Sequence, residues 1–169
     1  MPRSLMYVTF LFAIAPLACS PSSSSGDGST SSGPRPDFTT PEGAILKLEE
    51  AYRKGDLEAA VACKDFHLEA TYMLKYETAA KWTQTDQLNE LILSTAEILE
   101  LAYRAEMETS GLPDFEGIRS TFPKKEIVTD DIYRVTEVCT FPDGGTSQQD
   151  LFVGRRNGEW KVLHVAKPK

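Results

Sequence analysis

Glu137 is the residue of this chain best placed for acid–base chemistry. It lies in the run Ile132 to Phe141, whose residues alternate as in a β-strand. Alternation places five residues on one face, namely Tyr133, Val135, Glu137, Cys139 and Phe141. A carboxyl group in such apolar surroundings has a raised pKa, which suits a general base. The alternative is that this part of the sheet meets water, and we favour it because Glu is rarely buried without a partner.

His164 is the second candidate for chemistry. By alternation it shares a strand face with Trp160, Val162 and Ala166, where it either lines a pocket or is an ordinary strand residue with satisfied nitrogens. A single His is more often the latter. Tyrosine hydroxyls either line the same pocket or reach the surface from the core. The candidate pocket residues are Glu137, His164, Tyr72, Tyr76, Tyr133 and Trp160, and Tyr103 is a further tyrosine of this kind.

A polar cluster, Asp65-Phe66-His67-x-Glu69, lies at the predicted junction of two helices. Asp65 or His67 is well placed to cap the helix that follows, and we favour this structural role over a chemical one.

Two cysteines of the predicted domain, Cys63 and Cys139, either form a disulfide or are buried as free thiols. A disulfide between them would close a loop of about 77 residues and stabilise the fold by about 4 kcal/mol on a chain-entropy model. We favour buried free thiols, because Cys63 lies with Ala59 and Ala60 on a face of small residues, where a thiol behaves as a small apolar group.

The sequence lacks the motifs of several kinds of functional site. The two histidines, His67 and His164, are far apart and belong to no metal-ligand motif, so we expect no metal. Neither a glycine-rich phosphate loop nor a nucleophile elbow is present, and we expect no cofactor. The net charge is −7, with 18 Lys and Arg against 25 Asp and Glu. An acidic chain without a basic stripe is a poor nucleic-acid binder.

The elements that position these residues form two groups. Thr40 caps a first helix with Pro41 at its first position, and this helix runs to Gly55. We expect Glu49–Arg53 and Glu50–Lys54 ion pairs on its solvent side. Further helices are predicted over 57–64, after an Asp56 cap, over 68–82, and from Thr85 or Asp86 to the residue before Gly111. The strands are predicted within 124–169, over 132–141, 148–155 and 160–165, with an Asn157-Gly158 hairpin turn between the last two.

The N-terminal segment has the pattern of an export signal. Arg3 precedes an apolar run, Leu5 to Ala15, that is too short to span a bilayer. It ends in Pro16-Leu17-Ala18-Cys19, which resembles the lipobox of bacterial lipoproteins, although Leu17 lies one place later than usual. The rival is ordinary cleavage after Ala15. We expect a signal peptide over 1–18, lipidation of Cys19 and a Ser/Gly/Pro-rich disordered tether over 19–38.

The order of elements over 39–169 resembles the nuclear transport factor 2-like superfamily. The residues that carry the resemblance are the Thr-Pro-Glu helix start at 40–42, Lys-Gly-Asp-Leu-Glu-Ala-Ala at 54–60 and Gly-Glu-Trp-Lys-Val at 158–162. The resemblance implies an α+β, cone-shaped domain with N-terminal helices packed on a curved antiparallel sheet. It implies little about function, because the superfamily includes enzymes such as isomerases and dehydratases, immunity proteins and domains without known chemistry.

We therefore expect an envelope lipoprotein that is anchored in the membrane by its lipid and faces the periplasm or the cell exterior. Its domain is expected to bind a small apolar ligand or a protein partner without catalysis. The alternatives are an isomerase- or dehydratase-like enzyme with an acid in the cone, and an accessory or immunity-like protein that binds a partner, or a second copy, through the outer sheet face.

Overall fold

The computed structural model describes residues 38–77 and 85–165, and for Glu77, Thr85 and Val165 the backbone only. The chain divides into two units, Met1–Gly33 and Pro34–Lys169, and every described residue belongs to the second. The expected signal peptide, Cys19 and nearly all of the expected tether therefore lie outside the described residues.

Two short helices begin at predicted caps. Helix α1, Pro41–Arg53, starts after Thr40, whose hydroxyl oxygen accepts a 3.0 Å hydrogen bond from the Gly43 amide. It ends before Gly55, which has a φ of 66° that favours glycine. Helix α2, Leu57–Ala62, starts at the predicted Asp56 cap and is two residues shorter than expected.

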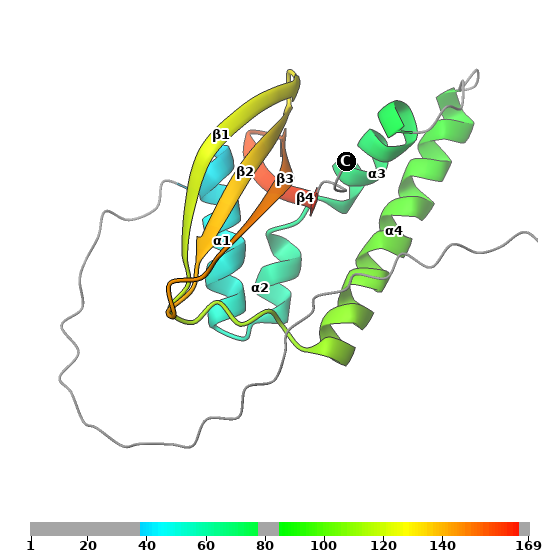
Figure 1. Ribbon diagram of the computed structural model, residues 1–169. Helices are drawn as coiled ribbons and strands as arrows, with labels where there is room; N and C mark the ends of the chain where they lie inside the picture. Colours follow the sequence, from blue (N-terminus) through cyan, green and yellow to red (C-terminus); the bar gives the residue numbers. More distant parts are fainter. Residues whose placement is uncertain (1–37, 78–84, 166–169) are drawn as a thin grey trace, which may run out of the picture. The chain divides into compact units, whose positions relative to one another are not determined.

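The second pair of helices differs more from expectation. Helix α3, Phe66–Tyr72, begins two residues earlier than predicted, because the Asp65 carboxylate caps it by accepting a 2.9 Å hydrogen bond from the Leu68 amide. It continues into a π-helical turn, Met73–Glu77, labelled η1. The remainder of the predicted helix, to Trp82, lies outside the described residues. Helix α4, Thr85–Ser110, has the predicted bounds and ends at Gly111. Figure 1 shows α3 beside α4, and the two are in contact.

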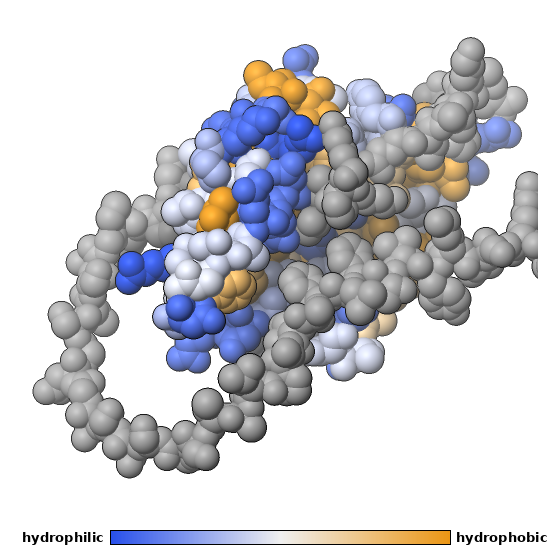
Figure 2. Space-filling view, viewed as in Figure 1, coloured by the Kyte–Doolittle hydropathy of each residue, from blue (hydrophilic) through white to orange (hydrophobic). Residues whose placement is uncertain are grey.

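A four-stranded antiparallel sheet in the order β1-β2-β3-β4 follows the helices. Its strands are β1 (Arg119–Thr129), β2 (Ile132–Thr140), β3 (Thr146–Arg156) and β4 (Glu159–Val165). The predicted α+β class with helices first is thus confirmed, although β1 begins earlier than expected. Asn157 and Gly158 join β3 to β4 with φ values of 54° and 84°, which is the predicted hairpin turn. The tip of the β1–β2 hairpin exposes Ile127 and Val128 as an apolar patch (Figure 2).

The two faces of the sheet bury different helices. One face packs on α1 and α2, in a core of Ala44, Ile45, Leu48, Ala51, Ala60, Cys63, Val135, Leu151, Val153 and Val162. The other face packs on α3, in a smaller cluster of Tyr72, Ile132, Phe152 and Leu163, with Leu68 against it. These faces are called the α1 face and the α3 face below.

A bulge in β4 changes which residues lie on each face. Val162 pairs with Val153 and Val165 pairs with Leu151, so two residues, Leu163 and His164, lie opposite Phe152 alone. The ring of His164 lies 4.8 Å from that of Phe152, centroid to centroid. His164 is therefore on the α3 face, and the prediction that it shares a face with Trp160 and Val162 is wrong. Simple alternation fails because the bulge inserts one residue into the period of two.

None of the helices in the described residues is both long and apolar enough to cross a membrane.

Candidate functional site

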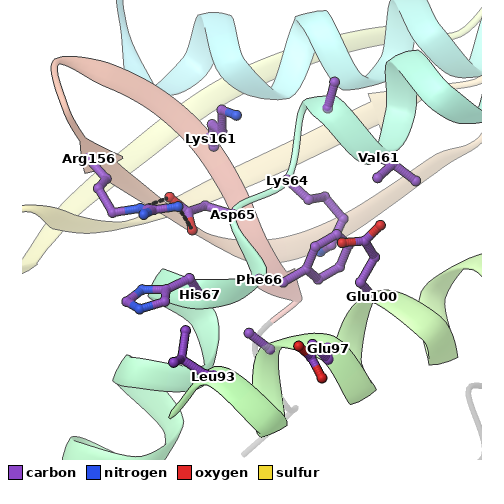
Figure 3. Close-up of a pocket in the computed structure, with 12 residues that line it drawn as sticks. Val61, Lys64, Asp65, Phe66, His67, Leu93, Glu97, Glu100, Arg156 and Lys161 are labelled. Atoms are coloured by element: carbon purple, nitrogen blue, oxygen red, sulfur yellow. Dashed lines mark hydrogen bonds and ion pairs between the residues drawn. The ribbon is translucent and has the colours of Figure 1, made fainter. Parts of the chain in front are cut away.

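An open cleft lies where the α2–α3 junction meets α4 and the β3–β4 hairpin. Its volume is about 340 Å³, which is within the range of small-ligand sites. Figure 3 shows Arg156 and Lys161 on one side, Glu97 and Glu100 of α4 on the other, and the Phe66 ring between them. The lining residues are Val61, Ala62, Lys64, Asp65, Phe66, His67, Leu93, Ala96, Glu97, Glu100, Arg156 and Lys161.

Asp65 and Arg156 form the fixed polar wall of this cleft. Two nitrogens of the Arg156 guanidinium donate to the two Asp65 carboxylate oxygens at 2.6 and 2.9 Å. Asp65 is only 5% exposed and also caps α3, so its position is set by the helix start as well as by the ion pair. The hydrogen bond to Asp65 raises the pKa of Arg156, which stays charged. The sequence offered Asp65 or His67 as the cap of the following helix, and in the structure Asp65 is the cap.

Lys64 is a buried cation behind the cleft. Its ammonium group donates to the Leu163 carbonyl oxygen, lies 3.5 Å from a Glu69 carboxylate oxygen, and stands 5.4 and 5.3 Å from the ring centres of Phe66 and Tyr103. Burial lowers the pKa of Lys64, and the Glu69 carboxylate opposes this shift. With these partners the Lys64 charge holds the α2–α3 junction against β4.

Two charged residues of the cleft have no ion-pair partner among the described residues. They are Lys161 on β4 and Glu97 on α4, on opposite sides of the cleft (Figure 3). Glu100, by contrast, pairs with Arg104 at 2.9 Å. Leu93 is 56% exposed in the same cleft. The cleft thus offers one free charge of each sign and an apolar wall of Leu93 and Phe66.

A second polar cluster is the carboxyl pair of Glu49 on α1 and Glu137 on β2. Both side chains are buried between α1 and the α1 face of the sheet, with exposures of 2% and 1%. One oxygen of Glu49 accepts a 2.6 Å hydrogen bond from Arg53, and one oxygen of Glu137 accepts a 2.7 Å bond from the Gln149 amide. The other oxygen of each carboxyl is buried and accepts no hydrogen bond from a described donor. The Glu137 carboxyl is a hydrogen-bonding neighbour of the Glu49 carboxyl, and such a bond requires a proton on one of the two.

The electrostatics of the site favour the protonated form of Glu49. Burial, and the neighbouring Glu137 carboxyl, raise the pKa of Glu49 to about 7, while Ser120 and Arg53 act in the opposite direction. The expectation that Glu137 faces water is therefore wrong, because α1 covers this part of the sheet. The Glu49–Arg53 pair exists as predicted, but Glu49 lies on the core side of α1. The four-residue spacing from Ile45, a core residue, is the sequence signal that could have placed Glu49 there.

His164 lies on the α3 face, away from the carboxyl pair. Its Nδ1 is 3.9 Å from a Glu69 carboxylate oxygen, and its ring lies near those of Tyr72 and Phe152. Tyr72 stacks on Tyr76 at 5.5 Å between ring centres, and Tyr76 is 61% exposed. The structure thus brings together His164, Tyr72 and Tyr76.

The other predicted pocket residues lie on the opposite face. Tyr133 and Trp160 meet edge to face at 5.2 Å on the α1 face, where Glu137 also lies. The six candidate residues therefore do not form one pocket, and Glu137 and His164 form no dyad. The sequence could not place them because the bulge in β4 leaves no residue-type signal.

Both described cysteines are free and buried, Cys63 in the core of the α1 face and Cys139 beside Ser120, with 3.6 Å between sulfur and hydroxyl oxygen. The disulfide alternative is not present, in agreement with the favoured prediction. Burial raises the pKa of Cys139 to about 11, so this thiol is not a ready nucleophile. Within the described ranges no three His, Cys, Asp or Glu side chains are grouped to hold a metal ion.

No family model and no curated protein matches the chain. Among solved structures, an NTF2-like transpeptidase, so described, from Campylobacter jejuni aligns at 13% identity and a TM-score of 0.36, over 73% of this chain and 98% of that chain.

An NTF-2 like protein of unknown function from Shewanella oneidensis MR-1 aligns at 15% identity and a TM-score of 0.39, over 72% of this chain and 90% of that chain. A ketosteroid isomerase-like protein from Erwinia carotovora atroseptica aligns at 13% identity and a TM-score of 0.34, over 79% and 99%. Similarity at this level transfers no activity or ligand to this chain.

Proposed function

We propose that this protein is a lipid-anchored envelope protein whose domain binds a small ligand in the cleft at the α2–α3 junction, without catalysis. The observation that supports this most directly is the cleft itself, with free charges at Lys161 and Glu97 and the apolar Leu93 and Phe66 between them. The anchor is Cys19, as the lipobox-like Ala18-Cys19 indicates.

The ligand class follows from the charges of the cleft walls. The cationic side, Lys161 and Arg156, suits a carboxylate, and the acidic side, Glu97 and Glu100, suits an ammonium group. The apolar wall suits a hydrocarbon side chain of the same molecule. A small zwitterion, such as a free amino acid or a dipeptide with an apolar side chain, satisfies all three features. This is a more polar ligand than the one expected from the sequence.

Binding without catalysis is favoured by where the acid–base groups lie. Neither Glu49, Glu137 nor His164 lines the cleft. Of the ionisable groups that do line it, Lys64, Asp65, Glu100 and Arg156 are held in ion pairs. His67 also lines the cleft, but its Nδ1 is buried and accepts or donates no hydrogen bond among the described residues. Catalysis requires a base within hydrogen-bond reach of a bound substrate.

The test is calorimetric titration of the full mature chain with leucine, with isoamylamine (leucine without its carboxyl group) and with 4-methylpentanoate (leucine without its amino group). We expect binding of the zwitterion and about tenfold weaker binding of each partial analogue. Leu93→Lys should abolish binding. Leu101→Lys, at an exposed leucine of the same helix outside the cleft, is the matched control. Equal binding of leucine by the Leu93→Lys and Leu101→Lys variants would contradict the proposal. It would also be contradicted if the unmodified chain bound none of the amino acids or dipeptides tested.

A second candidate function is acid–base catalysis by the Glu49–Glu137 pair. The specific observation in its favour is the raised pKa of Glu49, about 7, beside a second carboxyl group. Its test is the accessibility of the pair to a small reagent. Reaction of a water-soluble carbodiimide with Glu49 in the folded chain would support this candidate, and protection until unfolding would oppose it.

A further inference from the structure

Helix α4 has a second apolar face that no described element covers. Ile98 and Leu101 are 65% and 66% exposed, the largest apolar exposures on this helix. At 100° per residue they form a stripe with Leu91, Ala102 and Ala105. This stripe is called the outer face of α4, and part of the apolar surface of α4 is visible in Figure 2.

The opposite side of α4 already supplies the packing that the fold needs. Ile92 is 4% exposed on that side, and Tyr103 packs against Phe66 of α3 and hydrogen-bonds Tyr52 of α1. Helix α4 is thus apolar on two sides. A surface helix that needs only one face for its own fold has the other available for a partner.

The charge around the outer face is strongly acidic. The helix carries six acidic residues, Asp86, Glu90, Glu97, Glu100, Glu106 and Glu108, and one basic residue, Arg104. Arg104 is engaged with Glu58 at 2.6 Å and with Glu100 at 2.9 Å. Glu90, Glu97 and Glu108 fall within about 40° of Leu101 around the helix, on one rim of the stripe. They have no ion-pair partner among the described residues.

We propose that the outer face of α4 is a docking surface for a protein partner that presents a cationic amphipathic helix. The apolar stripe supplies the buried area, and the acidic rim requires Lys or Arg at the flanking positions of the partner. A second copy of this chain fits poorly, because pairing two outer faces would bring two acidic rims together. An anionic bilayer fits poorly for the same reason. The apolar stripe lies outside the ligand cleft, and Glu97 borders both surfaces.

The probe for this surface is a designed helical peptide of about five turns, with Leu on one face and Lys on the other. The full mature chain is titrated into the labelled peptide, and fluorescence anisotropy is measured. The matched control peptide has Glu in place of every Lys. We expect binding of the Leu/Lys peptide only, with an affinity that falls as salt rises.

Variants locate the binding. The double variant Ile98→Gln/Leu101→Gln should weaken binding at least about tenfold. Leu93→Gln, an equally exposed leucine of the same helix that lies in the cleft, should leave it unchanged. Equal binding by the two α4 variants would overturn the proposal, as would binding of the Leu/Glu peptide.

The rival occupants give distinct results. A dimer in analytical ultracentrifugation that the Ile98→Gln/Leu101→Gln variant dissociates would show that a second copy covers the surface, and would overturn the proposal. Binding of phosphatidylglycerol vesicles to the Cys19→Ser chain, which lacks a lipid, with release of the peptide, would show that a bilayer covers the surface. This result would also overturn the proposal. We expect the chain to be a monomer and not to bind such vesicles. We also expect its binding of the peptide to require Ile98 and Leu101.

Discussion

Glu49 of α1 and Glu137 of β2 meet as two buried carboxyl groups with one described cation, Arg53, hydrogen-bonded to the pair. Each has one buried oxygen without a described donor. Their charge state therefore couples the stability of the helix–sheet contact to pH.

The stability of the domain should fall as pH rises from about 4.5 to about 7. The pKa of Glu49 is about 7 in the folded chain against an ordinary glutamate value of 4.5, so the folded chain binds more protons across this range. The stabilisation is present below the lower pKa and is lost as pH rises through the higher one. At about 1.4 kcal/mol per pKa unit, the whole effect is roughly 3 kcal/mol. Urea unfolding of the full mature chain at several pH values measures it.

Glu49→Gln is the variant that isolates this effect, because Gln resembles the protonated carboxyl. It should flatten the pH dependence and be more stable than the unmodified chain at pH values above about 8. Glu50→Gln, one residue along α1 and exposed to solvent, is the control and should retain the full dependence. If Glu49→Gln and Glu50→Gln showed the same slope, the carboxyl pair would not be the source.

Asp65→Asn should destabilise the domain by about 1–2 kcal/mol, because it removes the charge that pairs with the half-exposed Arg156. Asn caps helices as well as Asp does, so the capping of α3 should be retained. Asp56→Asn, at the cap of α2, is the matched control and should be nearly neutral. Equal effects of the two substitutions would show that the ion pair with Arg156 makes no measurable contribution to stability.

Two thiols should be silent in the folded chain and reactive after unfolding. Cys63 and Cys139 are buried, and burial raises the pKa of both. Titration with a thiol reagent of a Cys19→Ser chain, purified without reductant, should count both thiols in denaturant and react slowly without it. Absence of any thiol in denaturant would mean that they form a disulfide in the oxidised protein.

Cys19→Ser should move the protein from the membrane fraction to the soluble fraction. The prediction rests on the apolar run that ends in Ala18-Cys19 and on the serine-rich stretch that follows. Fractionation of cells that express each form is the measurement, with Cys63→Ser as control. A Cys19→Ser protein that stays with the membrane as the unmodified form does would rule out the lipid anchor.

The sequence predicts those features that depend on neighbours along the chain. The caps at Thr40 and Asp56, the end of α1 at Gly55 and the hairpin turn at Asn157-Gly158 all follow from local conformational preferences. For Glu49 the local signals conflict, because its spacing from Ile45 favours the core side and its i,i+4 spacing to Arg53 suits an exposed ion pair. The cleft does not follow from local preferences, because its walls come from α2, α3, α4 and the β3–β4 hairpin. Such features depend on how elements pack, which a single sequence does not contain.

The bulge in β4 has a consequence for the chemistry that this sheet can carry. On a regular ladder after Val162, His164 would lie opposite Leu151, on the face that carries Glu137. An imidazole and a carboxyl group would then lie on the same face of the sheet, as a general acid–base site requires. The one additional residue of the β4 bulge places His164 and Glu137 on opposite faces of the sheet instead. A shift of one residue in strand pairing, without any substitution, is therefore sufficient to bring together or to separate two reactive groups in such a sheet.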